Sequence, residues 1–433
     1  MTKKIVLAAM AALFLLPSFA PANGLNLNGL GSRAQGMGGA FVSIANDFSA
    51  VFWNPAGAAG FSQPTFGFYA TDLMPRMTYR LDSAIPDAPV VDAKSKVSHY
   101  LGFLAGYYKP LSSKVVIGLG IGTPSAQGAM WNGADFTSLS DGVAYDRSSR
   151  IYVFSFSPLV AVKLSDAISV GMTLNINCGT SSLKMPAGLS SFPISIDPVD
   201  LGQYEENATG WGFGATFGVL VRPIDTLSIG LTVRTPSTIT FDGSARMSNM
   251  TLFDLPGSSD IRREISWPLW AAGGVSFRPI GRLLLSADVQ WTQWSKLDQI
   301  RTTFIDPIWA ELGAVEGRDV QVLDWKNTAQ IRFGAEYMLD GTTALRAGYY
   351  NDPAPGPDST LSVLLPIHTF NVFSIGVGKT VGDLQLDFGL AYLAGNKRNA
   401  FTVHAALLGL PTGMEGIYGT HAVVPTASVS YKF

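Results

Sequence analysis

Apolar and polar residues alternate with a period of two along several segments of this chain. The pattern is clearest at the C-terminus, where apolar side chains occupy every second position: Ala427, Val429, Tyr431 and Phe433. Thr, Ser and Lys residues fill the positions between them. Successive side chains of a β-strand point to opposite faces, so each such segment presents one apolar and one polar face. Residues 283–292 and 384–392 repeat the pattern, and we predict an all-β fold of long, one-sided strands.

The polar faces of these strands carry ionisable residues, which helps to decide between two all-β classes. A soluble sandwich would leave such a face in solvent and bury the other in a dry core, whereas a membrane barrel turns its polar face inward. The ionisable residues concerned are Arg234, Asp288, Arg332, Glu336, Arg346, Asp387 and Lys432. Their recurrence opposite long apolar faces favours the barrel.

The lengths of the links between strands also favour a barrel. We predict strands near residues 64–78, 97–108, 113–122, 149–163, 166–178, 207–222, 226–241, 263–277, 282–298, 325–338, 342–351, 368–379, 383–393 and 421–433. Short and long links alternate strictly, and the short ones lie at 109–112, 163–166, 222–225, 278–281, 339–341 and 380–382. Bacterial outer-membrane barrels have even strand numbers, short periplasmic turns and long external loops. We therefore predict a 14-stranded antiparallel transmembrane β-barrel over residues 62–433, in the outer membrane of a Gram-negative bacterium.

Residues 1–22 have the layout of a secretory signal peptide. Lys3 and Lys4 precede the apolar run Ile5–Leu16, and the small-residue site Ala20–Ala22 follows. We expect cleavage after Ala22. A helical membrane anchor would need about 20 apolar residues, and this run is shorter. No later apolar stretch reaches that length without interruption, so we expect no helical membrane span in the mature chain.

Residues 23–61 lack the strand pattern, and we predict that they form a compact N-terminal hatch. Glycines crowd the first half and Asn46–Gly57 follows, so short helical turns joined by Gly and Pro are expected. A 14-stranded cylinder is wide enough to leak unless something fills its lumen. We place the hatch there as a plug, with Phe52, Trp53, Asn54 and Pro55 as candidate residues. The alternative, a periplasmic leader, would leave Phe52 and Trp53 exposed.

Composition removes several other classes of function. Charged residues make up 14% of the 433 residues, against about 25% in an average soluble domain, which argues against an ordinary cytosolic enzyme. The 30 Lys and Arg residues balance 32 Asp and Glu residues without forming a basic block, so nucleic acid is not an expected partner. One cysteine, Cys178, and four scattered histidines show no metal-ligand spacing. We expect no metal and no cofactor.

Short motifs follow one another along the chain in a recognisable order. Gly29–Gly31, the Ala- and Gly-rich run 34–40 and Asn54–Gly57 come first, and further motifs lie at 211–214, 291–295, 325–328 and 351–357. Together they resemble the OmpP1/FadL/TodX family (the FadL family) of outer-membrane long-chain fatty acid and hydrocarbon transporters, whose hatch carries an Asn-Pro-Ala motif. The resemblance implies a monomeric barrel plugged by its own N-terminus, a docking groove among the loops and an internal hydrophobic site. It also implies sideways release into membrane lipid through a kink in the third strand.

The third predicted strand has the composition that such a kink requires. Within Val115–Pro124, Gly118, Gly120 and Gly122 share one face and Pro124 lies at the outer end, so the strand bends or bulges easily. The resemblance places a lateral gate at these glycines. The alternative is that they make room for the hatch against the wall, and one kink can serve both purposes.

The predicted external loops are apolar, whereas those of a porin for polar solutes would be hydrophilic. The fifth and seventh loops are apolar at 304–312 and 405–410, and the fourth contains Met247, Met250, Leu252, Phe253 and Leu255. Apolar side chains gathered in a water-facing region indicate a capture surface for a hydrophobic ligand. Packing of these loops on one another as a lid is a compatible alternative.

A fatty-acid carboxylate inside an apolar site would need a cation, because an unpaired buried charge is costly. Lys326 is the first candidate, since it shares the inward parity of Arg332 and Glu336. Its aromatic–Lys–Asn setting resembles the aromatic–Lys–Asp run that supplies a headgroup lysine in family members, although Asn327 departs from that run. Arg332 is the second candidate. For both residues the alternative is a structural ion pair in the lumen, such as one between Arg332 and Glu336.

These observations predict a passive importer of hydrophobic small molecules, long-chain fatty acids first, with aromatic or aliphatic hydrocarbons as the alternative cargo. Its expected partners are the ligand and outer-membrane lipid. A general porin for polar solutes is disfavoured by the predicted plug and the apolar loops. An outer-membrane hydrolase would need a nucleophile beside a histidine. No recognisable Ser partner accompanies His99, His368, His404 or His421, so we do not expect an enzyme.

Overall fold

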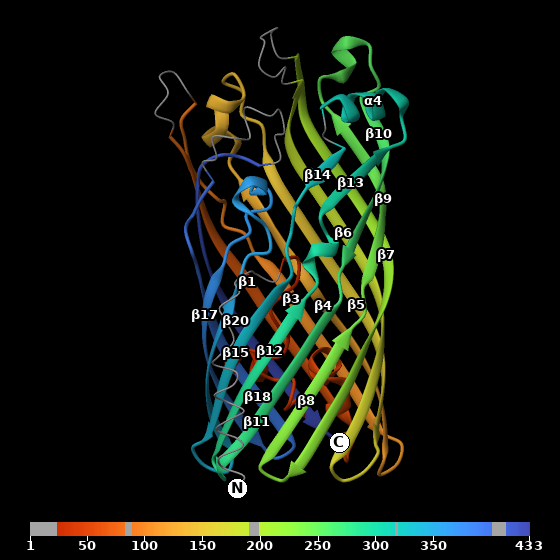
Figure 1. The fold of residues 1–433 in the computed structure, drawn as a ribbon, viewed down its shortest axis with the longest axis vertical. Helices are drawn as coiled ribbons and strands as arrows, with labels where there is room; N and C mark the ends of the chain where they lie inside the picture. The colour runs from red at the N-terminus through yellow and green to blue at the C-terminus, as the bar shows by residue number, and fades with distance from the viewer. Residues whose placement is uncertain (1–23, 83–88, 190–198, 317–318, 401–412) are drawn as a thin grey trace.

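The computed structural model describes residues 24–82, 89–189, 199–316, 319–400 and 413–433. Within these residues the strands form an antiparallel wall that closes on itself where β1 (Thr65–Leu81) pairs with β20 (Ile417–Lys432). The closed wall is the 14-stranded barrel that the sequence predicts. Figure 1 shows its strands as tilted ribbons around a long central axis.

Most wall strands are single segments. Besides β1 and β20 they are β3 (Tyr100–Pro110), β4 (Val115–Trp131), β5 (Arg147–Lys163), β6 (Ile168–Leu189), β7 (Val199–Ile224), β16 (Thr343–Asp352), β17 (Phe370–Val381) and β18 (Leu384–Gly395). The other wall strands are each built from two segments that meet at a break. These pairs are β8 (Leu227–Arg234) with β9 (Ser237–Met247), β10 (Ser258–Trp267) with β11 (Trp270–Ile280), β12 (Leu283–Thr292) with β13 (Gln299–Phe304), and β14 (Val320–Val322) with β15 (Thr328–Met338).

The short links predicted from the sequence lie together at one end of the barrel. Gly281 and Arg282 join β11 to β12, and Gly382 and Asp383 join β17 to β18. The C-terminal residue Phe433 lies at this end as well (Figure 1). The long links lie at the opposite end, where the short strands β2 (Val91–Lys94) and β19 (Arg398–Asn399) extend the wall. Helix α4 (Pro307–Glu316) lies at the same rim (Figure 1).

Strands β6 and β7 are longer than the sequence predicts. Strands were expected near 166–178 and 207–222, whereas the observed ladder continues to the pair of Leu189 with Val199. The outer part of this hairpin contains Pro186, Gly188 and Gly202, which read as loop residues in the sequence. Cross-strand pairs stabilise it nonetheless, and Lys184 Nζ lies 2.9 Å from Glu205 Oε1.

The two faces of the wall differ as the alternation predicts. Along β12, Ser286, Asp288 and Gln290 face the lumen and are buried. Exposed apolar side chains cover the outside of the wall, among them Phe66, Phe68, Ile121, Phe156, Leu174, Phe217, Leu231, Ile375, Phe388 and Leu390. Such an apolar band is what a transmembrane barrel presents to lipid. Lys432 pairs with the buried Thr65 and so lies on the lumen face, as predicted, but it is exposed because it lies at the very end of β20.

The segment before β1, residues 24–64, packs against the inner face of the wall (Figure 1). It contains α2 (Ser32–Gly36), α3 (Ala50–Trp53) and the 3-10 helix η1 (Pro55–Gly60), so short helical turns are present as expected. Wall glycines allow its backbone to approach closely. A Cβ atom at Gly106 would lie 2.7 Å from the carbonyl oxygen of Phe48. We call residues 24–64 the N-terminal segment.

Two predictions concern residues outside the described ranges. They are the signal peptide at 1–22 and the apolar part of the seventh loop at 405–410. In the part of the chain that is described, no helix is both long enough and apolar enough to cross a membrane.

Candidate ligand site

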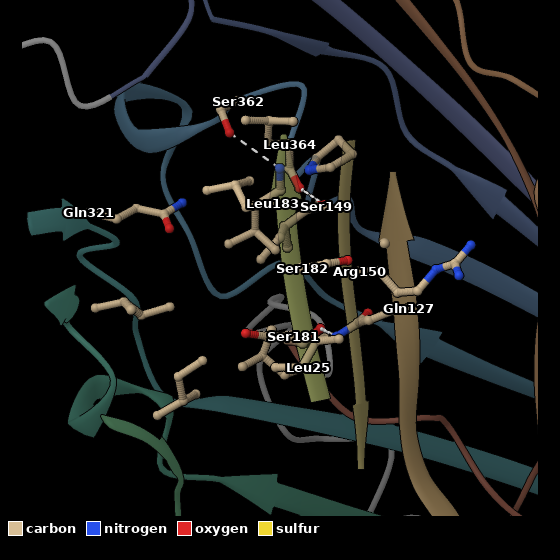
Figure 2. A pocket seen from close by; sticks show the side chains of 18 of the residues that line it. Leu25, Gln127, Ser149, Arg150, Ser181, Ser182, Leu183, Gln321, Ser362 and Leu364 are labelled. Carbon is tan, nitrogen blue, oxygen red and sulfur yellow. Dashed lines mark hydrogen bonds between the residues drawn. The ribbon is translucent and has the colours of Figure 1, made fainter. Parts of the chain in front are cut away.

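A cavity of about 650 Å³ lies inside the barrel, between the N-terminal segment and the long-loop end. Figure 2 shows part of its lining, in which Gln321 of β14 faces Leu183 of β6 across open space. Most of the lining is apolar, including Leu25, Leu183, Ile265, Ile300, Phe304 and Trp309. A cavity of this size, mostly apolar with a few convergent polar groups, has the character of a small-molecule site. We call it the upper cavity.

Part of the charge in the upper cavity is internally neutralised. Arg263 of β10 donates from Nη1 and Nη2 to the two carboxylate oxygens of Glu206, at 2.6 and 2.7 Å. Its Nε and Nη2 also donate to Thr302 Oγ1, and the Tyr204 hydroxyl donates to Glu206 Oε2 at 2.6 Å. Four of the five guanidinium N–H donors are therefore engaged, and Glu206 neutralises the charge of Arg263. This cluster is thus a poor candidate to bind an anion.

Arg147, the first residue of β5, also lines the upper cavity and is only 7% exposed. Its guanidinium stacks on the ring of Phe136, with 4.9 Å between the guanidinium carbon and the ring centre. Among the described residues it forms no hydrogen bond and no ion pair, and its Nε atom is fully buried without a partner. A buried cation without a partner is costly, so Arg147 is the candidate to receive an anionic ligand group.

The sequence analysis missed Arg147. It lies in the polar run Asp146–Arg150, just before the predicted start of its strand at residue 149, and such a run reads as loop surface. No local pattern distinguishes it from the other arginines. Only the way β5 closes over Phe136 of the 3-10 helix η2 (Gly133–Leu139) buries it.

His368 contributes a second buried polar atom to the lining of the upper cavity. Its Nδ1 lies 2.9 Å from the carbonyl oxygen of Asn396, while its Nε2 is buried without a partner. Burial lowers the pKa of His368 to about 4, the Asn396 hydrogen bond works against this shift, and Arg398 adds to it. His368 is therefore neutral near pH 7, with Nε2 able to accept a hydrogen bond.

Only one of the predicted fourth-loop residues lines the upper cavity. Met247 does so from the end of β9. Met250 is buried in the 3-10 helix η3 (Met250–Phe253) without reaching the cavity, and Leu255 packs against the same hydrophobic cluster. Leu252 and Phe253 are exposed at 77% and 48%. The predicted group is thus divided between the cavity, the protein interior and the surface.

The inward orientation predicted for Lys326 is wrong. Its side chain is exposed and outside the residues that line the cavity. Along a continuous strand every second side chain lies on the same face, which would place Lys326 on the face of Arg332. The break at residues 323–327, between β14 and β15, interrupts this alternation, so the inference does not extend to Lys326. Trp325 is the residue that turns inward there, and it packs edge-on against Trp294.

Arg332 is buried, but it contacts the N-terminal segment rather than the cavity. Its Nη1 donates to the carbonyl oxygens of Asn28 and Gly38 at 2.9 and 3.2 Å. Its guanidinium stacks on the ring of Tyr350 at 4.1 Å. The suggested ion pair between Arg332 and Glu336 does not form, because Glu336 pairs instead with Arg33 and Arg346.

The four candidate hatch residues contact the wall or the rest of the N-terminal segment. Trp53 Nε1 donates to Leu30 O at 2.8 Å. Asn54 Nδ2 donates to three carbonyl oxygens, those of Val42, Val219 and Leu231, the last two on β7 and β8. Pro55 is buried and Phe52 is partly buried. These contacts hold the segment against the wall.

Strand β4 is kinked close to the predicted glycines. Its pairing with β3 ends at Leu104 and Gly122, and its register against β5 shifts between Gly122 and Ser125. Thr123 Oγ1 accepts a hydrogen bond from Phe103 N at 3.0 Å where the ladder stops. Beyond this point β4 binds the N-terminal segment, since Leu27 N donates to Pro124 O at 2.9 Å.

The glycines of β4 face the lumen and are surrounded closely. A Cβ atom at Gly118 would lie 2.6 Å from the ring of Tyr108, and one at Gly120 would lie 2.7 Å from Val51 of the N-terminal segment. One at Gly122 would lie 2.9 Å from Leu104. Room for the N-terminal segment and a kink in the strand therefore occur together, as the sequence left open.

Comparisons with known proteins agree with this architecture. The model of a family described as outer membrane protein transport protein (OMPP1/FadL/TodX) matches residues 13–433. The chain is similar to outer membrane protein P1 of Haemophilus influenzae, at 26% identity over 44% of this chain and 40% of that protein. It is also similar to the long-chain fatty acid transport protein of Salmonella typhi, at 22% identity over 86% of each chain. A crystal structure of a Pseudomonas aeruginosa FadL homologue has the same fold, with a TM-score of 0.77 at 16% identity, covering 95% of this chain and all of that one.

Proposed function

This chain belongs to the OMPP1/FadL/TodX family of outer-membrane transport proteins, and from that premise we propose that it imports hydrophobic small molecules passively, long-chain fatty acids first. The barrel lies in the outer membrane of a Gram-negative bacterium. Its long-loop end then faces the outside of the cell and its short turns face the periplasm. Its role is transport rather than catalysis.

Capture begins at the long-loop rim in this proposal. Leu252 and Phe253 are exposed there, as is Ile305 next to α4. Exposed apolar side chains at a water-facing rim offer a first contact for a ligand that water disfavours. Met247 stands between this rim and the upper cavity, and its unbranched, adaptable side chain suits ligands of differing shape.

The upper cavity holds the ligand chain. Its volume of about 650 Å³ falls within the range of ordinary small-molecule sites, which is roughly 300–1,000 Å³. Moving a C16 chain from water into apolar surroundings gains on the order of 12 kcal/mol, at about 0.8 kcal/mol per CH₂. An apolar lining is therefore sufficient to retain the chain without specific contacts.

Arg147 is the residue that favours a fatty acid over a hydrocarbon as the ligand. It is a buried cation beside an apolar cavity and has no acidic partner among the described residues. A carboxylate matches a guanidinium edge with two parallel hydrogen bonds. Such a pair would satisfy both charges, whereas a toluene-like ligand would leave Arg147 as it is.

Release sideways through the β4 kink completes the route. The ladder between β3 and β4 stops at Gly122, and the outer wall beside it is apolar, with Leu101, Ile121 and Phe154 exposed. An exit into lipid spares the chain a return to water. The N-terminal segment closes the way straight down, and we propose that a single barrel performs the whole cycle.

Binding of palmitate and of hexadecanol to the purified protein tests the role of Arg147. Hydrogen bonds to a charged group contribute roughly 1.5–3 kcal/mol, so Arg147→Gln should raise the Kd for palmitate about tenfold or more. The Kd for hexadecanol should change less than about twofold. Arg262→Gln is the matched control, since Arg262 is exposed and pairs on the surface with Asp242. Equal losses for the two ligands would remove the headgroup role of Arg147.

Aromatic or aliphatic hydrocarbons remain the second candidate cargo, because most of the upper-cavity lining is apolar. Toluene binding that exceeds palmitate binding in the wild-type protein would favour this candidate. Lys326→Ala serves as a further comparison. Its side chain is exposed and lies outside the cavity lining, and an exposed charge contributes at most about 1 kcal/mol. Palmitate affinity should therefore change by less than about fivefold.

A further inference from the structure

A second, smaller cavity of about 80 Å³ lies beneath the upper one, between the N-terminal segment and the wall from β3 to β11. Asn26 lines both cavities, so the two are stacked on either side of it. One side of the lower cavity is apolar, with Val51, Leu104 and Val153. The other side is polar. This two-sided lining fits an amphiphile better than a plain hydrocarbon.

The polar side ends in an arginine without an acidic partner. Arg234 of β8 lies between two aromatic rings, with its guanidinium carbon 4.9 Å from the ring centres of both Phe52 and Trp270. Its Nη2 donates to Phe52 O at 3.0 Å. No carboxylate pairs with it among the described residues. Stacking engages the faces of a guanidinium but leaves N–H groups at its edge available.

The wall next to Arg234 is a hydrogen-bonded row of neutral polar side chains. Thr216 is the direct cross-strand neighbour of Arg234, and its Oγ1 accepts from Asn175 Nδ2 at 2.9 Å. Ser157 Oγ donates to Asn175 Oδ1 at 3.0 Å. Such a row lowers the cost of bringing an ionised group into the barrel, because hydroxyl and amide groups replace part of its water shell.

The lower cavity also reaches the kink of β4. Gly122 and Pro124 line it together with Leu104, at the point where the β3–β4 ladder stops. A volume of about 80 Å³ is enough for only several water molecules, since one water needs roughly 10–15 Å³ of such space. The lower cavity therefore holds a headgroup and its first carbons, and the rest of a long chain must lie elsewhere.

We propose that Arg234 and the polar row beside it form a second carboxylate site, which holds the headgroup of a fatty acid while its hydrocarbon tail leaves through the β4 kink. This inference rests on the proposed function. The tail enters lipid first, because lipid keeps each CH₂ out of water, where it would cost about 0.8 kcal/mol, whereas an unpaired carboxylate is penalised in lipid. Arg234 keeps the charge paired until the tail is in the membrane.

Carbon-13 NMR of carboxyl-labelled palmitate bound to the full-length protein in neutral detergent tests the second site. Under saturating ligand, the wild-type protein should show two bound carboxyl resonances. Arg147→Gln should remove one and Arg234→Gln the other, while Arg282→Gln, at an exposed turn, should keep both. If Arg234→Gln keeps both resonances, or if only one exists and it depends on Arg147, the second site is overturned and the proposed function stands. If neither Arg147→Gln nor Arg234→Gln changes the spectrum, the second site and the headgroup role of Arg147 in the proposed function are both overturned.

Two further measurements support this test. The first uses a second variant in case Arg234→Gln does not fold, and the second uses a short carboxylate in place of a fatty acid. Ser155 lines the lower cavity, so Ser155→Leu fills it from β5 while leaving Arg234 and its rings in place, and it should also remove the second resonance. Retention of that resonance in a folded Ser155→Leu protein would contradict the proposal. Labelled propionate distinguishes a free short carboxylate from a transiting fatty acid. Saturation of the Arg234-dependent resonance by propionate in preference to palmitate would overturn the transit role.

Discussion

Arg33 of the N-terminal segment and Glu336 of β15 form a two-pronged ion pair inside the barrel. Arg33 Nε lies 2.7 Å from Oε2 and Nη2 lies 2.8 Å from Oε1 of Glu336. Arg346 Nε approaches the same carboxylate at 2.8 Å and pairs through Nη1 with Asp387 at 2.7 Å. Burial works against the charge of Arg33, but Glu336 outweighs it and raises the pKa of Arg33. The inward charges of this barrel thus attach the N-terminal segment to the wall.

Glu336→Gln should detach that segment in part. Breaking one member of a buried ion-pair network costs roughly 3–5 kcal/mol, because the remaining charges stay buried without compensation. We expect larger single-channel currents in planar bilayers and a lower unfolding midpoint. Asp82→Asn, which breaks the exposed pair with Arg80, is the control and should change neither. Unaltered currents in Glu336→Gln would show that the segment closes the lumen without this network.

Asn54→Asp should destabilise the protein more than Asn54→Ala. The Asn54 amide donates to three carbonyl oxygens, and an aspartate would place an acceptor with a buried charge among them. Each unsatisfied buried group costs roughly 1–3 kcal/mol, and the charge adds to that cost. Urea unfolding in detergent measures the difference. Asn132→Asp, at the exposed N-terminus of η2, should be nearly neutral, and the reverse order at Asn54 would refute this account of its role.

Gly122→Val tests the exit through the kink. A Cβ atom there would lie 2.9 Å from Leu104 and from the Phe103 carbonyl oxygen, so a branched side chain crowds the kink and forces its neighbours to shift. In proteoliposomes, we expect transfer of palmitate into lipid to slow about tenfold or more, which corresponds to a barrier higher by at least about 1.4 kcal/mol. The Kd of palmitate for the upper cavity of Gly122→Val should stay within about twofold of the wild-type value. Gly341→Val, in a turn with open space around its Cβ, is the control. Transfer at the wild-type rate would place the exit elsewhere.

Acid should destabilise the loop around His368. Its folded-state pKa is about 4 against 6.5 in the unfolded chain, so between these values the unfolded chain binds a proton that the folded one does not. Stability is therefore lost as the pH falls from 6.5 towards 4, by about 1.4 kcal/mol per pH unit at most. Arg398 and Asp358 are the charged groups that act on it.

The measurement is the unfolding midpoint at pH 7 and at pH 4.5. His368→Gln should lose less stability between these two values than the wild type, because glutamine does not titrate. His421→Gln removes an exposed histidine and should follow the wild type. A wild-type and a His368→Gln protein that weaken equally on acidification would show that His368 is not the responsible group.

The sequence alone was sufficient for the architecture of the wall. Alternation with a period of two and the alternation of link lengths are local properties, and they predicted fourteen strands and a lumen lined by ionisable residues such as Asp288 and Arg346. Motif resemblance added the family, which the comparison confirmed. The glycines of β4 were recognised because a flexible strand is visible in composition.

Only the tertiary structure decided which charges are free. Lys326 was expected inside and is exposed, because the break before β15 resets the parity of the strand. Arg332 bonds the N-terminal segment instead of Glu336, while Arg147 and Arg234 have no acidic partner among the described residues. Strand patterns report the face on which a side chain lies, but its partners across a closed barrel depend on shear, breaks and the inserted segment. Those are set by contacts between residues hundreds of positions apart in the chain.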